Sequence, residues 1–176
     1  SLFTGLDLAI GYATLGAGWL LMKTEGELQR RVYDLAWPLG AALLAAIGIV
    51  SLWTPFLDTG IAGRWFSWPN LLYLSPIPLL VLASAALYFA GLARRSERWP
   101  FFGALGLFLL SYAGLGVSLF PHVVPPRITI WDAAAPDKSL GFMLVGALIL
   151  VPIILAYTAH AYWVFRGKVG EEGYHH

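Results

Sequence analysis

Two ionisable side chains lie inside long apolar segments, where they could do chemistry. Asp7 lies in the apolar run 2–22, and His160 lies in the apolar run 140–165. Charged groups are costly inside a bilayer, so ionisable residues there often mark proton relays or ligand sites. A carboxylate at position 7 could belong to a proton path or accept a hydrogen bond from another subunit. An imidazole at position 160 could ligate haem iron.

Each of these two residues also has a structural interpretation. Asp7 lies about two turns into its expected helix, where it could be hydrated or stabilised by the positive end of the helix. A haem bound by His160 would need a second axial ligand, and Met143 is far along the same segment. The other histidines are expected outside the membrane: His122, His175 and His176. We therefore expect an interfacial His160, and Asp7 stays a candidate for a proton path or an interface.

A second candidate of that kind, Asp132, lies in a long connection that we expect to cover residues 121–139. Connections of this length are often functional, and four prolines stiffen this one: Pro121, Pro125, Pro126 and Pro136. Asp132 could cap a short turn through its side-chain oxygen, pair with Arg127, or take part in proton or quinone chemistry. The structural roles are favoured.

The composition indicates an all-α membrane protein. The chain has 176 residues, of which 59% are hydrophobic and 12% charged, and its mean hydropathy is +0.71. A soluble domain carries about a quarter charged residues. The net charge of +1 gives no basic surface for nucleic acid.

The residue types also exclude several kinds of site. The absence of cysteine excludes disulfides, cysteine-bound zinc, iron–sulfur clusters and covalent c-type haem. The sequence has no phosphate-binding glycine loop, metal-binding histidine pair or Ser/His/Asp set. We therefore predict no catalytic, cofactor-binding or metal-binding residue in this chain.

Five apolar segments are long enough to cross a bilayer, which takes about 20 helical residues. They are expected at 2–22, 35–57, 70 or 76 to 93, 100–120 and 140–165. Alanines spaced four apart, at Ala9, Ala13 and Ala17, predict close helix packing on one stripe. The expected fold is a four-helix bundle plus one additional helix, in a single domain over 1–176.

Prolines refine the expected helix bounds. Pro38 is expected in the first turn of the second helix, where a missing N–H is harmless. For the third helix we favour Ser75 as the capping residue and Pro76 as the first helical position. Pro152 should kink the fifth helix through the freed carbonyl of Leu148.

Basic residues predict the orientation. Eight of the Lys and Arg residues follow the first, third and fifth segments, and three follow the second and fourth. Positive residues stay in the cytoplasm. The N-terminus is therefore expected outside and the C-terminus in the cytoplasm.

Several local sequences together resemble subunit II of the cytochrome bd-type quinol oxidases. The matching stretches are GYA at 11–13, KTEGEL at 23–28, GVSLFPHVVPP at 116–126, ITIWDA at 128–133, VPIILAYTA at 151–159 and YW at 162–163. The resemblance covers essentially the whole chain but only the C-terminal half of a usual subunit II. The start at Ser1, without a basic leader, likewise suggests part of something longer or a processed product.

The resemblance implies a complex in the bacterial cytoplasmic (inner) membrane that works in the respiratory chain. In that family, subunit I carries the b and d haems, and the complex oxidises quinol and reduces dioxygen to water. Subunit II binds no haem; it scaffolds subunit I, could hold a structural quinone or lipid, and contributes to a proton route. The acidic residues of that route belong to the N-terminal half, so none is transferred here.

The partners that the resemblance implies are subunit I, the N-terminal half of subunit II, a small accessory subunit and membrane lipid. Two alternatives stay open from the residues alone. A small stand-alone secondary transporter or proton channel would bring polar residues together in mid-membrane from several helices. A b-type cytochrome would show haem absorbance from the purified chain.

Overall fold

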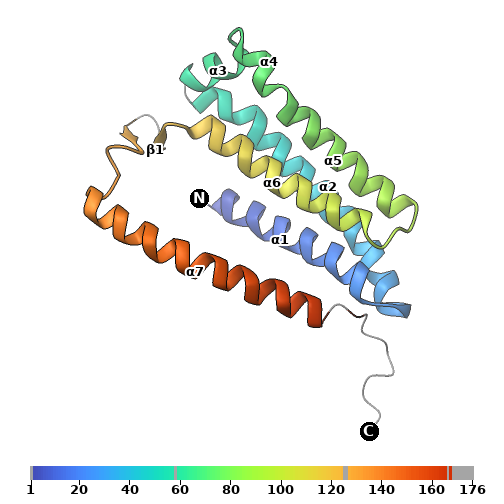
Figure 1. Ribbon diagram of the computed structural model, residues 1–176. Helices are drawn as coiled ribbons and strands as arrows, with labels where there is room; N and C mark the ends of the chain where they lie inside the picture. The colour runs from blue at the N-terminus through green and yellow to red at the C-terminus, as the bar shows by residue number, and fades with distance from the viewer. Residues whose placement is uncertain (1, 58, 125–126, 166, 168–176) are drawn as a thin grey trace. The chain divides into compact units, whose positions relative to one another are not determined.

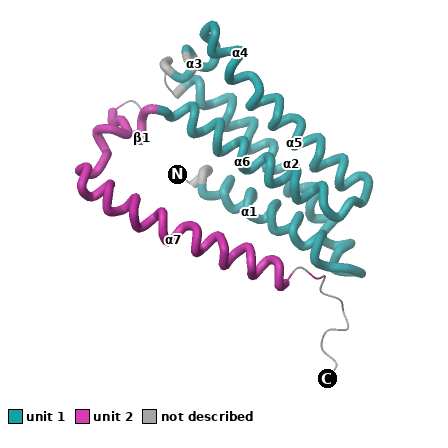
Figure 2. The backbone as a smooth tube through the Cα atoms, in the orientation of Figure 1, with its two compact units in different colours: residues 1–120, 168–176 teal, residues 121–167 magenta. Residues whose placement is uncertain are grey.

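The computed structural model describes residues 2–57, 59–124, 127–165 and 167, without the side chains of 2–4, 57, 59, 60, 62 and 64. The chain divides into two compact units, which we call unit 1 (residues up to 120) and unit 2 (residues 121–167) (Figure 2). Several residues used above lie outside the described part: Ser1, Pro125, Pro126, His175 and His176, together with Arg166 and Lys168, the two basic residues that follow the fifth segment.

Unit 1 is a bundle of four long helices (Figure 1). They are α1 (Leu2–Lys23), α2 (Gly26–Leu57), α5 (Pro76–Ala93) and α6 (Trp99–Leu119). Two short helices, α3 (Thr59–Phe66) and α4 (Asn70–Leu74), connect α2 to α5. Each long helix is long and apolar enough to cross a membrane.

Unit 2 contains a small hairpin and one long helix. Strands β1 (His122–Val124) and β2 (Ile128–Thr129) pair in antiparallel fashion and precede α7 (Asp137–Val164). Helix α7 is also long and apolar enough to cross a membrane. The predicted all-α membrane fold, with a four-helix bundle and one further helix, is confirmed.

The predicted start of the second helix is wrong. Helix α2 begins at Gly26, which has a positive φ of 70°, and Pro38 lies well inside it. The first two turns are polar and carry an i,i+4 ion pair between Glu27 and Arg31, so they continue the helix beyond its apolar part. A hydropathy pattern does not detect such an extension. At Pro38 the helix loses the hydrogen bond to the carbonyl of Asp34.

The prediction that Ser75 caps the third transmembrane segment is wrong. Pro76 does occupy the first position of α5, but Ser75 has helical dihedral angles of −55° and −29°. Its Oγ donates to the carbonyl oxygen of Leu72 at 3.0 Å and caps no N–H of α5. Ser75 therefore joins α4 to α5. In unit 2, α7 continues through Pro152.

The centre of unit 1 depends on Tyr88. This residue of α5 is fully buried, and its hydroxyl donates to the carbonyl oxygen of Ala36 on α2 at 2.7 Å. A methyl group at Gly40 of α2 would overlap the Tyr88 ring, and one at Gly103 of α6 would lie 2.6 Å from the Tyr88 backbone nitrogen. Glycine is therefore required on both helices where they meet α5.

The packed face of α1 differs from the predicted alanine stripe. Ala17 is buried, but Ala9 and Ala13 are exposed, whereas Thr14 and Leu21 are fully buried. A four-residue spacing turns by about 40° per step around a helix, whereas a seven-residue spacing stays close to one line. The buried line therefore follows positions 7, 14 and 21.

A glutamine of α2 binds the free carbonyl groups at the C-terminal end of α1. Gln29 Nε2 lies 2.9 Å from the carbonyl oxygens of both Leu21 and Thr24, and 3.3 Å from Glu97 Oε1 in the α5–α6 loop. The last carbonyls of a helix need partners from outside the helix. Gln29 thus connects the end of α1 to α2 and to the α5–α6 loop.

We predict that Gly103→Ala lowers the stability of the protein, with Gly116→Ala as the matched control. The added methyl meets Tyr88 backbone atoms, which cannot rotate away, so overpacking should cost about 1–3 kcal/mol. At Gly116, also on α6, nothing lies within 4 Å of the methyl position. Thermal unfolding in detergent measures both variants. Equal midpoints for the two would contradict the importance of this contact.

Candidate functional site

Asp7 lies on the buried line of α1. Positions 14 and 21, one and two heptads further along, are both fully buried. The Asp7 side chain is half-buried, and its Oδ1 is buried without a hydrogen-bond partner in the described part of the chain. The buried oxygen of the carboxyl group therefore points into unit 1, a direction that cannot be read from the residue type alone.

His160 lies on an exposed face of α7. Its ring is 6.1 Å from the ring of Trp163, centroid to centroid, with a tilt of 35°. Met143 precedes it by 17 residues, which is ~25 Å along a helix, so the two cannot bind opposite faces of one haem. Among the described residues, no group of three or more His, Asp or Glu could hold a metal ion. These residues do not fit a haem.

Asp132 caps a turn in the connection that follows α6. Its Oδ2 accepts hydrogen bonds from the backbone N–H of Thr129 at 3.1 Å and from Thr129 Oγ1 at 2.6 Å. In return, the Asp132 N–H donates to Thr129 Oγ1 at 3.2 Å. This reciprocal pattern is that of a capping box. The connection is also fixed by a bond from the Ile130 N–H to the Pro121 carbonyl oxygen at 2.8 Å.

The same hydrogen bonds favour the ionised form of the Asp132 carboxyl group. The side-chain and backbone donors of Thr129 lower the pKa of its carboxyl group below the ordinary value, and nearby His122 adds a smaller effect in the same direction. Hydrogen bonds to a carboxylate favour the charged form. Asp132 is therefore a charged, turn-closing residue.

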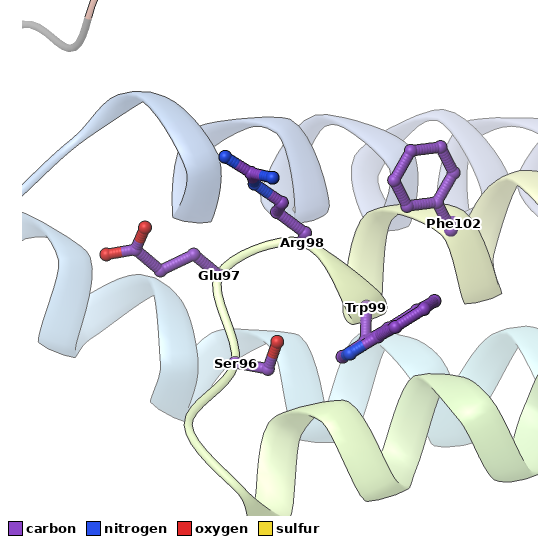
Figure 3. A pocket seen from close by; sticks show the side chains of 5 residues that line it. All are labelled: Ser96, Glu97, Arg98, Trp99 and Phe102. Carbon is purple, nitrogen blue, oxygen red and sulfur yellow. The ribbon is translucent and has the colours of Figure 1, made fainter.

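A shallow hollow lies at the α5–α6 loop. Its volume is about 500 Å³, and Figure 3 shows its lining side chains: Ser96, Glu97, Arg98, Trp99 and Phe102. Glu97 is already bound by Gln29. Two cations at this end of the bundle lie over aromatic rings, Lys23 at 5.2 Å from the Trp19 centroid and Arg95 at 5.1 Å from that of Tyr33. The hollow thus lies among polar and cation–ring contacts that connect the helices at the end of the bundle where α1 and α5 end and α6 begins.

Two polar residues of unit 1 were not singled out from the sequence. Ser111 of α6 has a buried Oγ without a hydrogen-bond partner in the described residues. Gln29 makes the contacts given above. Neutral polar residues are common in membrane helices, so their type gives no signal. Only the register of neighbouring helices shows what they face.

Comparison with known proteins relates the chain to one family. The family model described as cytochrome bd terminal oxidase subunit II matches residues 1–165. The match therefore covers the five long helices and the connection that holds Asp132.

Curated relatives carry corresponding names. Cytochrome bd-I ubiquinol oxidase subunit 2 of Escherichia coli K12 is 28% identical over 189 residues, which cover 90% of this chain and 50% of the relative. Cytochrome bd ubiquinol oxidase subunit 2 of Bacillus subtilis is 24% identical, covering 98% of this chain and 51% of the relative. The chain thus spans about half the length of the curated relatives it matches.

We predict that Asp132→Asn loosens the turn at Thr129. The native carboxylate has a lowered pKa, so its contribution is present above the ordinary pKa of aspartate and is lost as the pH falls through the lowered value. At neutral pH, the amides of Thr129, Asp132 and Ala133 should exchange hydrogen faster in the variant. The difference from the native protein should vanish only in strong acid.

Two control variants test whether the effect is specific to Asp132 and whether its partner is Thr129 or Arg127. Asp137→Asn removes an exposed carboxylate from the first turn of α7 and should leave these amides unchanged. Arg127→Gln tests the alternative pairing of Asp132. If Arg127→Gln reproduced the effect of Asp132→Asn while Thr129→Val did not, Arg127 and not Thr129 would be the partner.

Proposed function

The chain belongs to the cytochrome bd terminal oxidase subunit II family, and we propose that it is a haem-free scaffold segment of a quinol-oxidising, dioxygen-reducing membrane complex. The observation that carries this proposal is the family match over residues 1–165, which includes all five membrane-spanning helices. The names of two relatives support ubiquinol as the electron donor of such a complex. Menaquinol and other quinols have the same reacting groups.

The redox groups are proposed to belong to a partner. Haems b and d would be bound by subunit I, because the histidine and methionine of α7 cannot bind one haem together. In the complex, the haems would transfer electrons from quinol to dioxygen. The residues of this chain would hold the helices in place and exclude water and lipid from the partner.

Helix α7 supports a role in assembly. Its 28 residues are strongly apolar, and none of them is buried. In a membrane this surface would face lipid or other helices, among which we propose those of subunit I and of the N-terminal half of subunit II. A structural quinone or a small accessory subunit could occupy part of the same surface. Asp132, at the turn before α7, is proposed to shape an interface.

The proposed location is the bacterial cytoplasmic membrane, with the N-terminus of this chain outside and its C-terminus in the cytoplasm. The arrangement of basic residues supports this orientation. Lys23, Arg94, Arg95 and Arg98 lie at the end of unit 1 where α1 and α5 end and α6 begins. The connection with Asp132 follows the opposite end of α6.

We predict that the complete subunit co-purifies in mild detergent with a haem-bearing subunit, and that the haem absorbance follows the partner. Gly103→Ala should lower the yield of complex several-fold because it disturbs the packing of α6 against α5, and Gly116→Ala should not. A stoichiometric haem spectrum from the subunit expressed alone would contradict the proposal. So would purification as a solitary protein with transport activity, as expected of a stand-alone carrier or proton channel.

We predict which side of the membrane two connections of this chain face, and single-cysteine variants test it. The chain has no cysteine, so each introduced thiol is the one site of labelling within it. In intact spheroplasts, a membrane-impermeant maleimide should label Ala134→Cys in the outer connection. Ser96→Cys in the α5–α6 loop should be labelled only after the membrane is opened. The reverse pattern would show the opposite orientation.

A further inference from the structure

We propose that the hollow at the α5–α6 loop binds the headgroup of an anionic phospholipid, with Arg98 contacting its phosphate and Trp99 and Phe102 lying against the start of an acyl chain. The hollow combines a cation, a hydroxyl group and two aromatic rings around a volume of about 500 Å³. This volume is in the range of clefts that take small ligands. The inference rests on the membrane-spanning helices and not on the proposed redox complex.

The hollow lies at the level where lipid headgroups meet a membrane protein. Its lining residues are those between the end of α5 and the first turn of α6, and both helices are long and apolar enough to cross a membrane. Trp99 and Phe102 are exposed, and their rings meet edge to face at 6.5 Å between centroids. Tryptophan at such a helix end prefers the headgroup level. The hollow therefore suits a molecule that has both a polar and an apolar part.

The charges at this end of the bundle favour an anion. Segments 23–34 and 94–98, which the contact of Gln29 with Glu97 connects, together carry six basic and four acidic residues. The carboxylate of the hollow, Glu97, extends away from the two aromatic rings in Figure 3. The guanidinium of Arg98 makes no ion pair with a described carboxylate. It is therefore available to a phosphate group, whose oxygens a guanidinium can bind in bidentate fashion.

The turn that carries the lining residues is fixed by its backbone. The Ser96 N–H donates to the carbonyl oxygen of Gly91 at 2.9 Å, and Arg95 has a φ of 52°, in the left-handed region where glycine is the usual residue after a helix. A methyl at Gly91 would lie 2.9 Å from Trp99 Cβ, so the start of α6 packs directly on the end of α5. The lining is thus held in place before a ligand binds, which lowers the entropic cost of binding.

The exposed surface of α6 continues the hollow toward the middle of the membrane. Leu109 lies one heptad after Phe102, Gly116 lies one heptad after Leu109, and all three residues are exposed. Residues one heptad apart lie nearly above one another on a helix, so the three form an apolar line of ~21 Å. An acyl chain that leaves the hollow would lie along this line. A free phosphate would use neither the line nor the two aromatic rings, which is why we assign a phospholipid.

Native mass spectrometry of the complete subunit, purified with its partners and delipidated in mild neutral detergent, tests the ligand. Given equal, subsaturating amounts of dioleoylphosphatidylglycerol and dioleoylphosphatidylcholine, the native protein should retain more of the anionic lipid. Arg98→Gln should lower the retained phosphatidylglycerol about five-fold, the effect of one basic residue at a membrane surface. Lys138→Gln, at an exposed lysine in the first turn of α7, is the matched control and should retain the native amount. Equal retention by Arg98→Gln and the native protein would overturn the proposal, and is the result expected if a protein helix covers the hollow.

Thermal unfolding of the same protein separates a phospholipid from a small anion. Phosphatidylglycerol should raise the unfolding midpoint by a few degrees more than phosphatidylcholine does, because a ligand that binds the folded state stabilises it. Arg98→Gln should lose this difference, and Lys138→Gln should keep it. Inorganic phosphate at the same concentration should leave the midpoint unchanged. A shift from inorganic phosphate as large as that from phosphatidylglycerol would show a site for free anions and overturn the assignment of a lipid.

Discussion

The structure of unit 1 depends on the close approach of three helices around Tyr88. Inside a bilayer, apolar side chains gain little by leaving lipid, so helices associate through close packing and interhelical hydrogen bonds. Gly40 and Gly103 allow both neighbouring helices to reach α5, and the Tyr88 hydroxyl bonds to the carbonyl oxygen of Ala36. A single buried side chain thus provides both kinds of interaction.

The sequence was sufficient to predict the number and place of the membrane helices, because bilayer thickness fixes their length and apolar character. It was insufficient where a helix continues beyond the apolar part. The first turns of α2 are polar and stabilised by the pair of Glu27 and Arg31, so Pro38 was wrongly expected at a helix start. The packed side of α1 was also misjudged, because alanine is suited to both lipid and helix contacts.

The candidate polar residues were predictable to different degrees. Asp7 was identifiable because an ionisable residue is rare in an apolar segment. The burial of Ser111 was not predictable, because neutral polar residues are common in membrane helices and only the packing of α6 shows that its Oγ is buried. Asp132 lies between: the spacing from Thr129 matches a capping box, which is a local pattern, whereas the hydrogen bonds themselves were visible only in the structure.

The polar side chains of unit 1 are used mainly to join its own elements. Gln29 connects α1, α2 and the α5–α6 loop, Tyr88 connects α5 to α2, and the Trp65 indole N–H donates to Ser118 Oγ at 3.0 Å, connecting α3 to α6. Groups that transfer protons or electrons must be able to change partners or charge during a reaction. Groups committed to fixed contacts give a rigid support instead. Asp7 differs from these residues, because its Oδ1 is buried without a hydrogen-bond partner among the described residues.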